Sequence, residues 1–92
     1  MNPEAIGIKV SAIIQLKVDL PLLEQVVDDL KKLREVRFIT STSGEYQLIA
    51  QIAVQTHDIL TASFTKLRNI HGIVGMNSII QFQVFKNTFE LV

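Results

Sequence analysis

The sequence predicts a two-layer α+β fold with the element order β-α-β-β-α-β, and three features of the chain support this prediction. Long stretches alternate between apolar and other residues, which is typical of half-buried strands. Two further stretches carry apolar residues at helical spacing. The chain has 92 residues, of which 48% are hydrophobic, and this is enough for one small domain with its own core. We therefore expect residues 1–92 to form a single domain.

The first β-α-β unit begins with period-two alternation. Apolar residues occupy every even position from Ile6 to Val18, and this alternation predicts a strand with one buried face. Asp19 is expected to cap the helix that follows, and Pro21 suits the first turn of that helix. Apolar residues at helical spacing continue the predicted helix to Leu33.

The second half of the chain repeats these signals. Residues 36–40 are mostly β-branched or aromatic and predict a second strand, and alternation over residues 46–54 predicts a third. Thr56 or Asp58 can cap a second helix, and Gly72 is expected to end it. The apolar residues expected on the buried side of this helix are Ile59, Leu60, Phe64, Leu67 and Ile70.

A fourth strand is predicted after Gly72, with two alternating sets of side chains. One set is Met76, Ile80, Phe82 and Val84, and the other is Asn77, Ile79, Gln81, Gln83 and Phe85. Right-handed crossovers and a hairpin between strands two and three would give a four-stranded antiparallel sheet with both helices on one face. This arrangement is the ferredoxin-like β-α-β-β-α-β sandwich.

The stretch STSGEYQL, residues 41–48, connects the second and third predicted strands. Gly44 suits a tight hairpin turn, and we expect it to adopt a positive φ. The turn does not require Tyr46, whose hydroxyl and ring suit a contact with a ligand or with another subunit. Two interpretations therefore stay open: a structural turn alone, or a turn that also binds.

The sheet face that points away from the helices has an unusual composition. Its expected apolar residues are Ile13, Ile49, Ala53, Ile79 and Phe85, and its expected neutral polar residues are Ser11, Gln15, Gln51, Gln55, Asn77, Gln81 and Gln83. Charged residues, Lys9 and Lys17, stand only near the ends of the first strand. Isoleucines beside amides that can pair with one another suit a covered surface, so we predict a dimer formed by sheet-on-sheet packing.

Composition and spacing argue against several function classes. Nine basic and nine acidic residues cancel, so we do not expect this chain to bind DNA directly. There is no cysteine, and the two histidines, His57 and His71, lie beside predicted helix ends without metal-ligand spacing. We expect no catalytic residue, no metal site and no cofactor. No segment reaches the roughly 18 apolar residues of a membrane span, so we expect a cytoplasmic protein with no membrane partner.

Three stretches resemble the C-terminal effector-binding domain of the Lrp/AsnC (feast/famine) transcription regulators. They are REVRFITSTSGEYQLIAQIAV (residues 34–54), NIHGIVGMNSIIQFQVFK (residues 69–86) and AIGIKVSAIIQLKV (residues 5–18). The resemblance implies a regulatory, effector-sensing domain in which sheets pair into dimers. It further implies dimers of dimers or a tetramer of dimers, with a small effector such as an amino acid bound between dimers. It does not extend to a DNA-binding half, so we expect a stand-alone effector domain or a piece of a longer regulator.

The resemblance also implies which residues bind the effector. By position, the candidates are Ser43, Gly44, Glu45, Tyr46 and Gln47 from the turn, with Met76, Asn77 and Ser78 from the fourth strand. Gln47 stands where the family usually has aspartate, and the fourth-strand residues stand where threonines are common. An aspartate can pair with an ammonium group, whereas a glutamine offers only a neutral acceptor. The glutamine at this position favours the alternative of a purely structural assembly domain without a ligand. A dimeric ferredoxin-like enzyme is a further alternative function.

Overall fold

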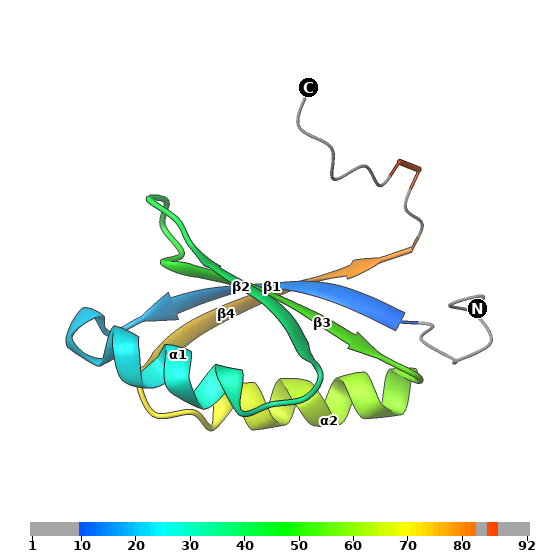
Figure 1. The fold of residues 1–92 in the computed structure, drawn as a ribbon, viewed down its shortest axis with the longest axis horizontal. Helices are drawn as coiled ribbons and strands as arrows, with labels where there is room; N and C mark the ends of the chain where they lie inside the picture. The colour runs from blue at the N-terminus through cyan, green and yellow to red at the C-terminus, as the bar shows by residue number, and fades with distance from the viewer. Residues whose placement is uncertain (1–9, 83–84, 87–92) are drawn as a thin grey trace.

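The computed structural model describes residues 10–82 and 85–86, and it has the predicted order of strands and helices (Figure 1). The strands are β1 (Val10–Val18), β2 (Val36–Ser41), β3 (Leu48–Val54) and β4 (Ile73–Gln81). The helices are the 3₁₀ helix η2 (Leu20–Leu22) and the α-helices α1 (Leu23–Lys31) and α2 (His57–Arg68).

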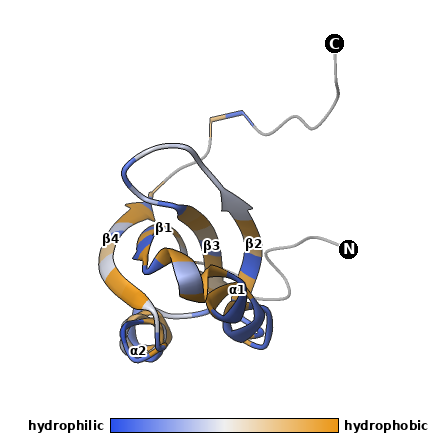
Figure 2. Ribbon diagram, turned by 90° about the vertical axis from the view of Figure 1, so that its left-hand side faces the viewer, coloured by the Kyte–Doolittle hydropathy of each residue, from blue (hydrophilic) through white to orange (hydrophobic). Residues whose placement is uncertain are grey.

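The four strands form one antiparallel sheet in the order β2-β3-β1-β4. Both α-helices lie on the same side of this sheet, and the β2–β3 turn extends beyond it on the opposite side (Figure 1). Figure 2, turned by 90°, shows the same two layers, with the open face of the curved sheet away from α1 and α2. The predicted ferredoxin-like sandwich is confirmed.

The hydrophobic core lies between the sheet and the helices. Every even residue of β1 and of β3 is buried, as the alternation predicted: Val10, Ala12, Ile14, Leu16, Val18, Leu48, Ala50, Ile52 and Val54. The helices contribute Val26 and Leu30 from α1 and Leu60 and Leu67 from α2. Fully burying a side chain of this size contributes about 1.5–3 kcal/mol to stability.

The starts of the two helical segments differ. The prediction that Asp19 caps a helix with its side chain is wrong, because its side chain makes no capping hydrogen bond. The Asp19 backbone is used instead: its N–H donates to Gly72 O at 2.8 Å, and its carbonyl accepts from Leu22 N at 2.8 Å. This backbone turn leads into η2, with Pro21 in its first turn. Thr56 does cap α2, since its side chain accepts a hydrogen bond from Ile59 N at 3.2 Å.

The predictions for Ile59 and for the end of the fourth strand need correction. Ile59 is exposed, because it lies in the first turn of α2, and Ser63 takes a buried position instead. Strand β4 ends at Gln81, so Phe82 and Phe85 follow the paired segment and are exposed. The expectations for Ile6, Ile8, Lys9, Gln83 and Val84 lie outside the described residues.

The predictions for two glycines need correction. Helix α2 ends at Arg68 with Asn69 as its C-cap, so Gly72 does not end the helix as expected. Among the described glycines only Gly72, between α2 and β4, has a positive φ, at 104°. The prediction of a positive φ for Gly44 is therefore wrong. The β2–β3 connection is wide enough to avoid it: Thr42 N donates to Gln47 O at 2.9 Å, so four residues lie inside the closing backbone hydrogen bond. A wider loop does not need the left-handed conformation that the tightest hairpin turns require.

Candidate functional site

The β2–β3 turn is attached to the end of β1 by the side chain of Gln47. Its Oε1 accepts a hydrogen bond from Val18 N at 2.8 Å, and its Nε2 donates to Glu45 O at 3.3 Å. Thr42 adds a hydrogen bond from its hydroxyl to Tyr46 O. Gln47 therefore holds the turn in place, and both of its polar groups are already used inside the chain.

Lys17 of β1 lies beside this turn and forms an ion pair with the turn residue Glu45. Its Nζ is 2.8 Å from Glu45 Oε1 and 5.8 Å from the centre of the Tyr46 ring. The hydrogen bond to Glu45 raises the pKa of Lys17, and the same contact lowers the pKa of Glu45. An exposed pair of this kind adds little to stability, but it places one cation, one anion and one aromatic ring together.

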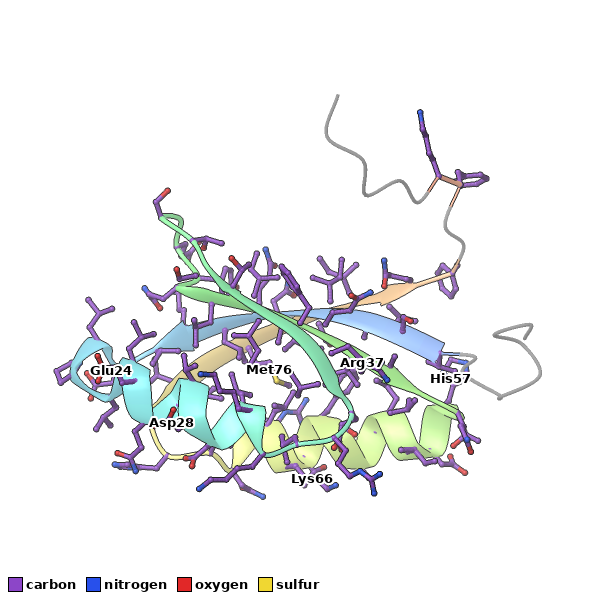
Figure 3. The ribbon with its side chains drawn as sticks, viewed as in Figure 1. Glu24, Asp28, Arg37, His57, Lys66 and Met76 are labelled. Atoms are coloured by element: carbon purple, nitrogen blue, oxygen red, sulfur yellow. The ribbon has the colours of Figure 1, made fainter. Side chains whose placement is uncertain are left out.

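The three candidates from β4 lie on the opposite edge of the sheet from β2. Met76 pairs with Leu16, which pairs in turn with Leu48, so Met76 is two strands, about 10 Å, from the end of the turn. Met76 packs against the core on the helix side, as Figure 3 shows, and Ser78 shares that side by alternation. Asn77 points to the open face, where its Nδ2 donates to Gln15 Oε1 at 2.7 Å.

The candidates therefore form two groups that meet different sides of the sheet. The turn group and Asn77 belong to the open side, whereas Met76 and Ser78 belong to the helix side. Met76 also lines a small hollow of about 240 Å³ between the end of α2 and the start of β4, together with Arg68, Ile73, Val74 and Gly75. A small ligand at the turn of one chain would therefore not contact Met76 and Ser78 of the same chain.

The open sheet face is the second feature of the site. The cross-strand register places these residues on it: Ser11, Ile13, Gln15, Lys17, Phe38, Thr40, Ile49, Gln51, Ala53, Asn77, Ile79 and Gln81. Its amides pair within the face, since Gln51 Nε2 donates to Gln81 Oε1 at 3.2 Å in addition to the Asn77–Gln15 bond. Sequence reasoning missed Phe38, because a register shift between Val36 and Phe38 turns this ring to the open side.

A cleft of about 430 Å³ lies on the other side of the sheet, between α1 and the edge strand β2. Its apolar lining comes from Leu23, Val27, Ile39 and Leu48, and its polar lining comes from Glu24, Asp28, Lys31, Thr40 and Ser41. Glu24 and Asp28 lie one turn apart on α1 (Figure 3). None of the residues that the resemblance implied as effector contacts lines this cleft.

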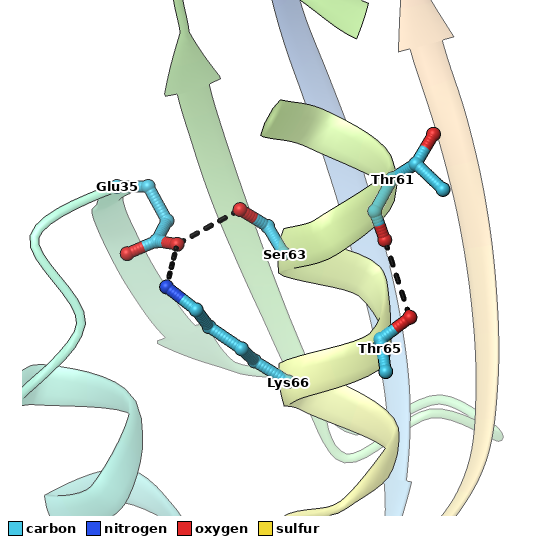
Figure 4. A network of polar contacts seen from close by, with 5 residues as sticks. All are labelled: Glu35, Thr61, Ser63, Thr65 and Lys66. Carbon is cyan, nitrogen blue, oxygen red and sulfur yellow. Dashed lines mark hydrogen bonds and ion pairs between the residues drawn. The ribbon is translucent and has the colours of Figure 1, made fainter. Parts of the chain in front are cut away.

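Glu35 is the least exposed carboxylate among the described ion pairs, and its contacts are structural. One oxygen, Oε2, accepts from the buried Ser63 hydroxyl at 2.8 Å and from Lys66 Nζ at 3.2 Å (Figure 4). A hydrogen bond from its own backbone and those from Ser63 and Lys66 lower the pKa of Glu35. The described residues contain no cluster of three or more side chains suited to a metal ion, and neither α-helix among them is long and apolar enough to span a bilayer.

Comparison with known proteins connects this geometry to a family. The model of the Lrp/AsnC ligand binding domain matches residues 11–91, which is nearly the whole chain. The chain belongs to the Lrp/AsnC ligand binding domain family. The HTH-type transcriptional regulator FL11 of Pyrococcus furiosus is 30% identical over 91 residues, which are 99% of this chain and 60% of the relative. The chain thus spans about three fifths of the length of that regulator.

Solved structures of other proteins share the fold. The transcriptional regulator NMB0573 of Neisseria meningitidis, solved in complex with L-methionine, superposes with a TM-score of 0.89 at 19% identity. That match covers 100% of this chain and 62% of NMB0573. The hypothetical protein PHS023 of Pyrococcus horikoshii superposes with a TM-score of 0.75 at 25% identity, covering 83% of this chain and 93% of PHS023. The fold therefore occurs both within longer regulators and in chains of similar length.

Proposed function

We propose that this Lrp/AsnC domain is a regulatory effector-sensing and oligomerisation module, and that residues 1–92 act as one such unit. It would bind a small molecule such as an amino acid between sheet-paired dimers and transmit that binding to a transcription regulator. The open sheet face is the observation that carries the proposal. Related proteins support it, because they are transcription regulators and one of them was solved with L-methionine.

The open sheet face suits coverage by a second copy of the chain. Ile13, Ile49, Ile79 and Phe38 give it an apolar surface, and four of its amide side chains are hydrogen-bonded to one another in two pairs. Polar groups that are paired within a surface lose little when water is excluded, whereas unpaired groups would oppose burial. Two copies can therefore pack sheet against sheet, and such dimers can assemble further into dimers of dimers or a tetramer of dimers.

The effector would bind near the β2–β3 turn, where a second dimer completes the site. Ser43, Gly44 and Glu45 are exposed there, and Tyr46 is half-buried beside Lys17. Met76, Asn77 and Ser78 would be supplied by the neighbouring dimer rather than by the same chain, because they lie two strands away. This arrangement needs no cofactor and no catalytic residue, and we propose that the domain has no enzymatic activity.

We propose that DNA binding is not a function of this domain by itself. The net charge of the chain is zero, so we do not expect specific DNA binding by this chain alone. A gel-shift titration at physiological salt should show no tight, sequence-dependent complex. Because a transcription regulator must have access to DNA, we propose that this protein is located in the cytoplasm.

The proposal can be tested by measuring assembly and ligand binding together. Sedimentation at micromolar concentration should show a dimer or larger species, and a thermal-shift screen of the twenty amino acids should identify at least one that stabilises the protein. The Tyr46→Ala variant should lose the higher oligomer or the ligand response more than it loses thermal stability. A monomer of about 10 kDa at that concentration would contradict the proposed interface.

A structural assembly domain without a ligand is the second candidate function. The geometry of Gln47 favours it, because both polar groups of this side chain are engaged within the chain. It would give the same oligomers, but no amino acid would change their size or their melting temperature. The combined sedimentation and thermal-shift experiment therefore distinguishes the two functions.

A further inference from the structure

Lys17 has a distinctive place in the sheet. It is the only charged residue within β1, β3 and β4, and it pairs with Gly75 of β4. A Cβ atom added to Gly75 would lie 3.2 Å from Lys17 Cβ and 3.3 Å from Lys17 Cδ. The absence of a side chain at Gly75 thus leaves room for the aliphatic part of Lys17 on the sheet.

The charged end of Lys17 meets the turn. Its Nζ is 2.8 Å from Glu45 Oε1, and the side chains of Lys17 and Glu45 are 41% and 69% exposed. The ring of Tyr46 lies beside the same ammonium group, with its centre 5.8 Å away. A small molecule can therefore approach both charges from solvent, next to an aromatic ring.

The position of Glu45 is set by the turn rather than by Lys17 alone. Gln47 donates to Glu45 O at 3.3 Å while it accepts from Val18 N at 2.8 Å. These bonds fix the backbone of Glu45 next to the end of β1, so its carboxylate would stay near Lys17 when their ion pair opens. Exposed ion pairs contribute little to stability, and opening this one would cost the fold little.

We propose that Lys17 and Glu45 form a binding site for the two charged groups of a zwitterion, and that their ion pair is the ligand-free, closed state of that site. The carboxylate of the ligand takes the place of Glu45 on Lys17, and the ammonium group of the ligand pairs with Glu45. Glu45 thereby supplies the negative charge of the site. This inference rests on the proposed effector-binding function, and it adds Lys17 to the candidate residues.

The alternative arrangements fit the geometry less well. Asn77 and Gln15 bond to each other on the open face, and both are neutral, so neither can give a carboxylate the charge-assisted hydrogen bond that Lys17 offers. The α1–β2 cleft carries Glu24, Asp28 and Lys31, but neither Lys17 nor Tyr46 lines it. Lys17 and Glu45 are thus the pair of opposite charges that the turn itself presents.

Isothermal titration with three variants tests the inference. The probes are the twenty L-amino acids, together with L-methioninamide, which lacks the carboxylate, and 4-(methylthio)butanoate, which lacks the amino group. For an amino acid that binds, Lys17→Met should weaken binding at least about tenfold, while Lys17→Arg should retain most of the affinity because the charge is kept. Lys31→Met, which removes a lysine from α1, is the matched control and should bind like the unmodified protein.

The Glu45→Gln variant gives a signature that a structural role would not produce. It removes both the internal competitor for Lys17 and the partner of the ligand ammonium. The zwitterion should then bind more weakly, whereas 4-(methylthio)butanoate should bind more tightly than it does to the unmodified protein. Thermal melts of each variant would establish that the fold is intact.

The outcomes separate the two proposals. If an amino acid binds and Lys17→Met leaves its affinity unchanged, the Lys17–Glu45 site is wrong and the effector-binding function stands. If none of the twenty amino acids binds to the unmodified protein or to any variant, both proposals are overturned. Loss of affinity in Lys17→Met, with recovery in Lys17→Arg, supports the site.

Discussion

Gln47 Oε1 accepts a hydrogen bond from the backbone N–H of Val18 at 2.8 Å, and this bond joins the β2–β3 turn to the last residue of β1. The two residues are 29 positions apart in the sequence, so the contact closes a long loop. Val18 is buried, and its N–H would lack this partner if the side chain of Gln47 were shortened. Gln47 thus has a structural role in the turn.

Removal of this side chain should destabilise the fold and release the turn. For Gln47→Ala we expect a loss of about 1–3 kcal/mol in the free energy of unfolding, because a part-buried N–H loses its partner. Urea denaturation measures the loss, and hydrogen exchange at the Val18 amide should become faster. Gln55→Ala, at an exposed position after β3, is the control and should stay within about 0.5 kcal/mol of the unmodified protein. Unchanged exchange at Val18 would contradict this role.

The roles of two glycines give a second, paired prediction. Gly72 has a φ of 104°, and a Cβ atom there would lie 2.7 Å from Val26 Cγ2 and 3.0 Å from Leu22 Cβ. Gly72→Ala should therefore cost at least about 1 kcal/mol, from backbone strain and from the clash. Gly44→Ala should be nearly neutral, because a Cβ there meets nothing within 4 Å. Thermal or urea melts of the two variants compare them, and equal losses would refute the distinction.

Strand alternation and helix periodicity were sufficient to predict the fold, because they depend on which residues avoid water. The even positions of β1 and β3 are the clearest case, and their burial follows directly from period two. Irregular positions could not be predicted in this way. The register shift beside Phe38 places that ring on the open face, and it depends on pairing with β3 rather than on any local pattern.

The candidate site was only partly predictable for a related reason. The turn residues were identified from their resemblance to a family, and Glu45 and Tyr46 do lie together next to β1. The sequence does not identify Lys17 as a site residue, because its role depends on a contact with Glu45, which lies 28 positions (45 − 17) further along the chain. A glycine in a two-residue hairpin turn usually has a positive φ, which is the reason for the prediction at Gly44. The β2–β3 loop is longer than such a turn, so the prediction fails.

The Glu35 network predicts a dependence of stability on pH. The pKa of Glu35 is lower in the folded protein than its ordinary value, so the folded state favours the charged carboxylate. Its contribution should be full above the unfolded pKa of roughly 4.3 and should be lost as the pH falls through the lower, folded pKa. Urea unfolding of Glu35→Gln and the unmodified protein, compared from pH 7 to pH 3, should show a difference that shrinks at acid pH.

Two variants separate the parts of this network. Glu35→Ala leaves the buried Ser63 hydroxyl without its acceptor and should cost about 1–3 kcal/mol at pH 7. Lys66→Met removes only the more exposed partner and should cost less, in the range of about 0–1 kcal/mol for an exposed ion pair. Glu35→Ala also removes the ion pair, so equal losses for the two variants would show that the ion pair, rather than the buried hydroxyl, is the main contact.

The open sheet face leads to the last prediction, which concerns assembly. Ile79 lies on this face in β4, and 47% of it is exposed in the single chain. In a sheet-to-sheet dimer a lysine at this position would bring an unpaired charge into the interface, which is unfavourable. We therefore expect Ile79→Lys to raise the dimer dissociation constant at least about tenfold, measured by sedimentation equilibrium, with little change in thermal stability of the monomer.

Leu20→Lys is the matched control for this prediction. Leu20 is more exposed than Ile79, at 63%, but it lies in η2 after the end of β1 and outside the open sheet face. A lysine there adds the same charge to the chain, so a general effect of charge on association would appear in both variants. Specific packing of the open face requires that only Ile79→Lys dissociates the dimer. If Leu20→Lys dissociates it equally, or if Ile79→Lys leaves it intact, the subunits meet through a different surface.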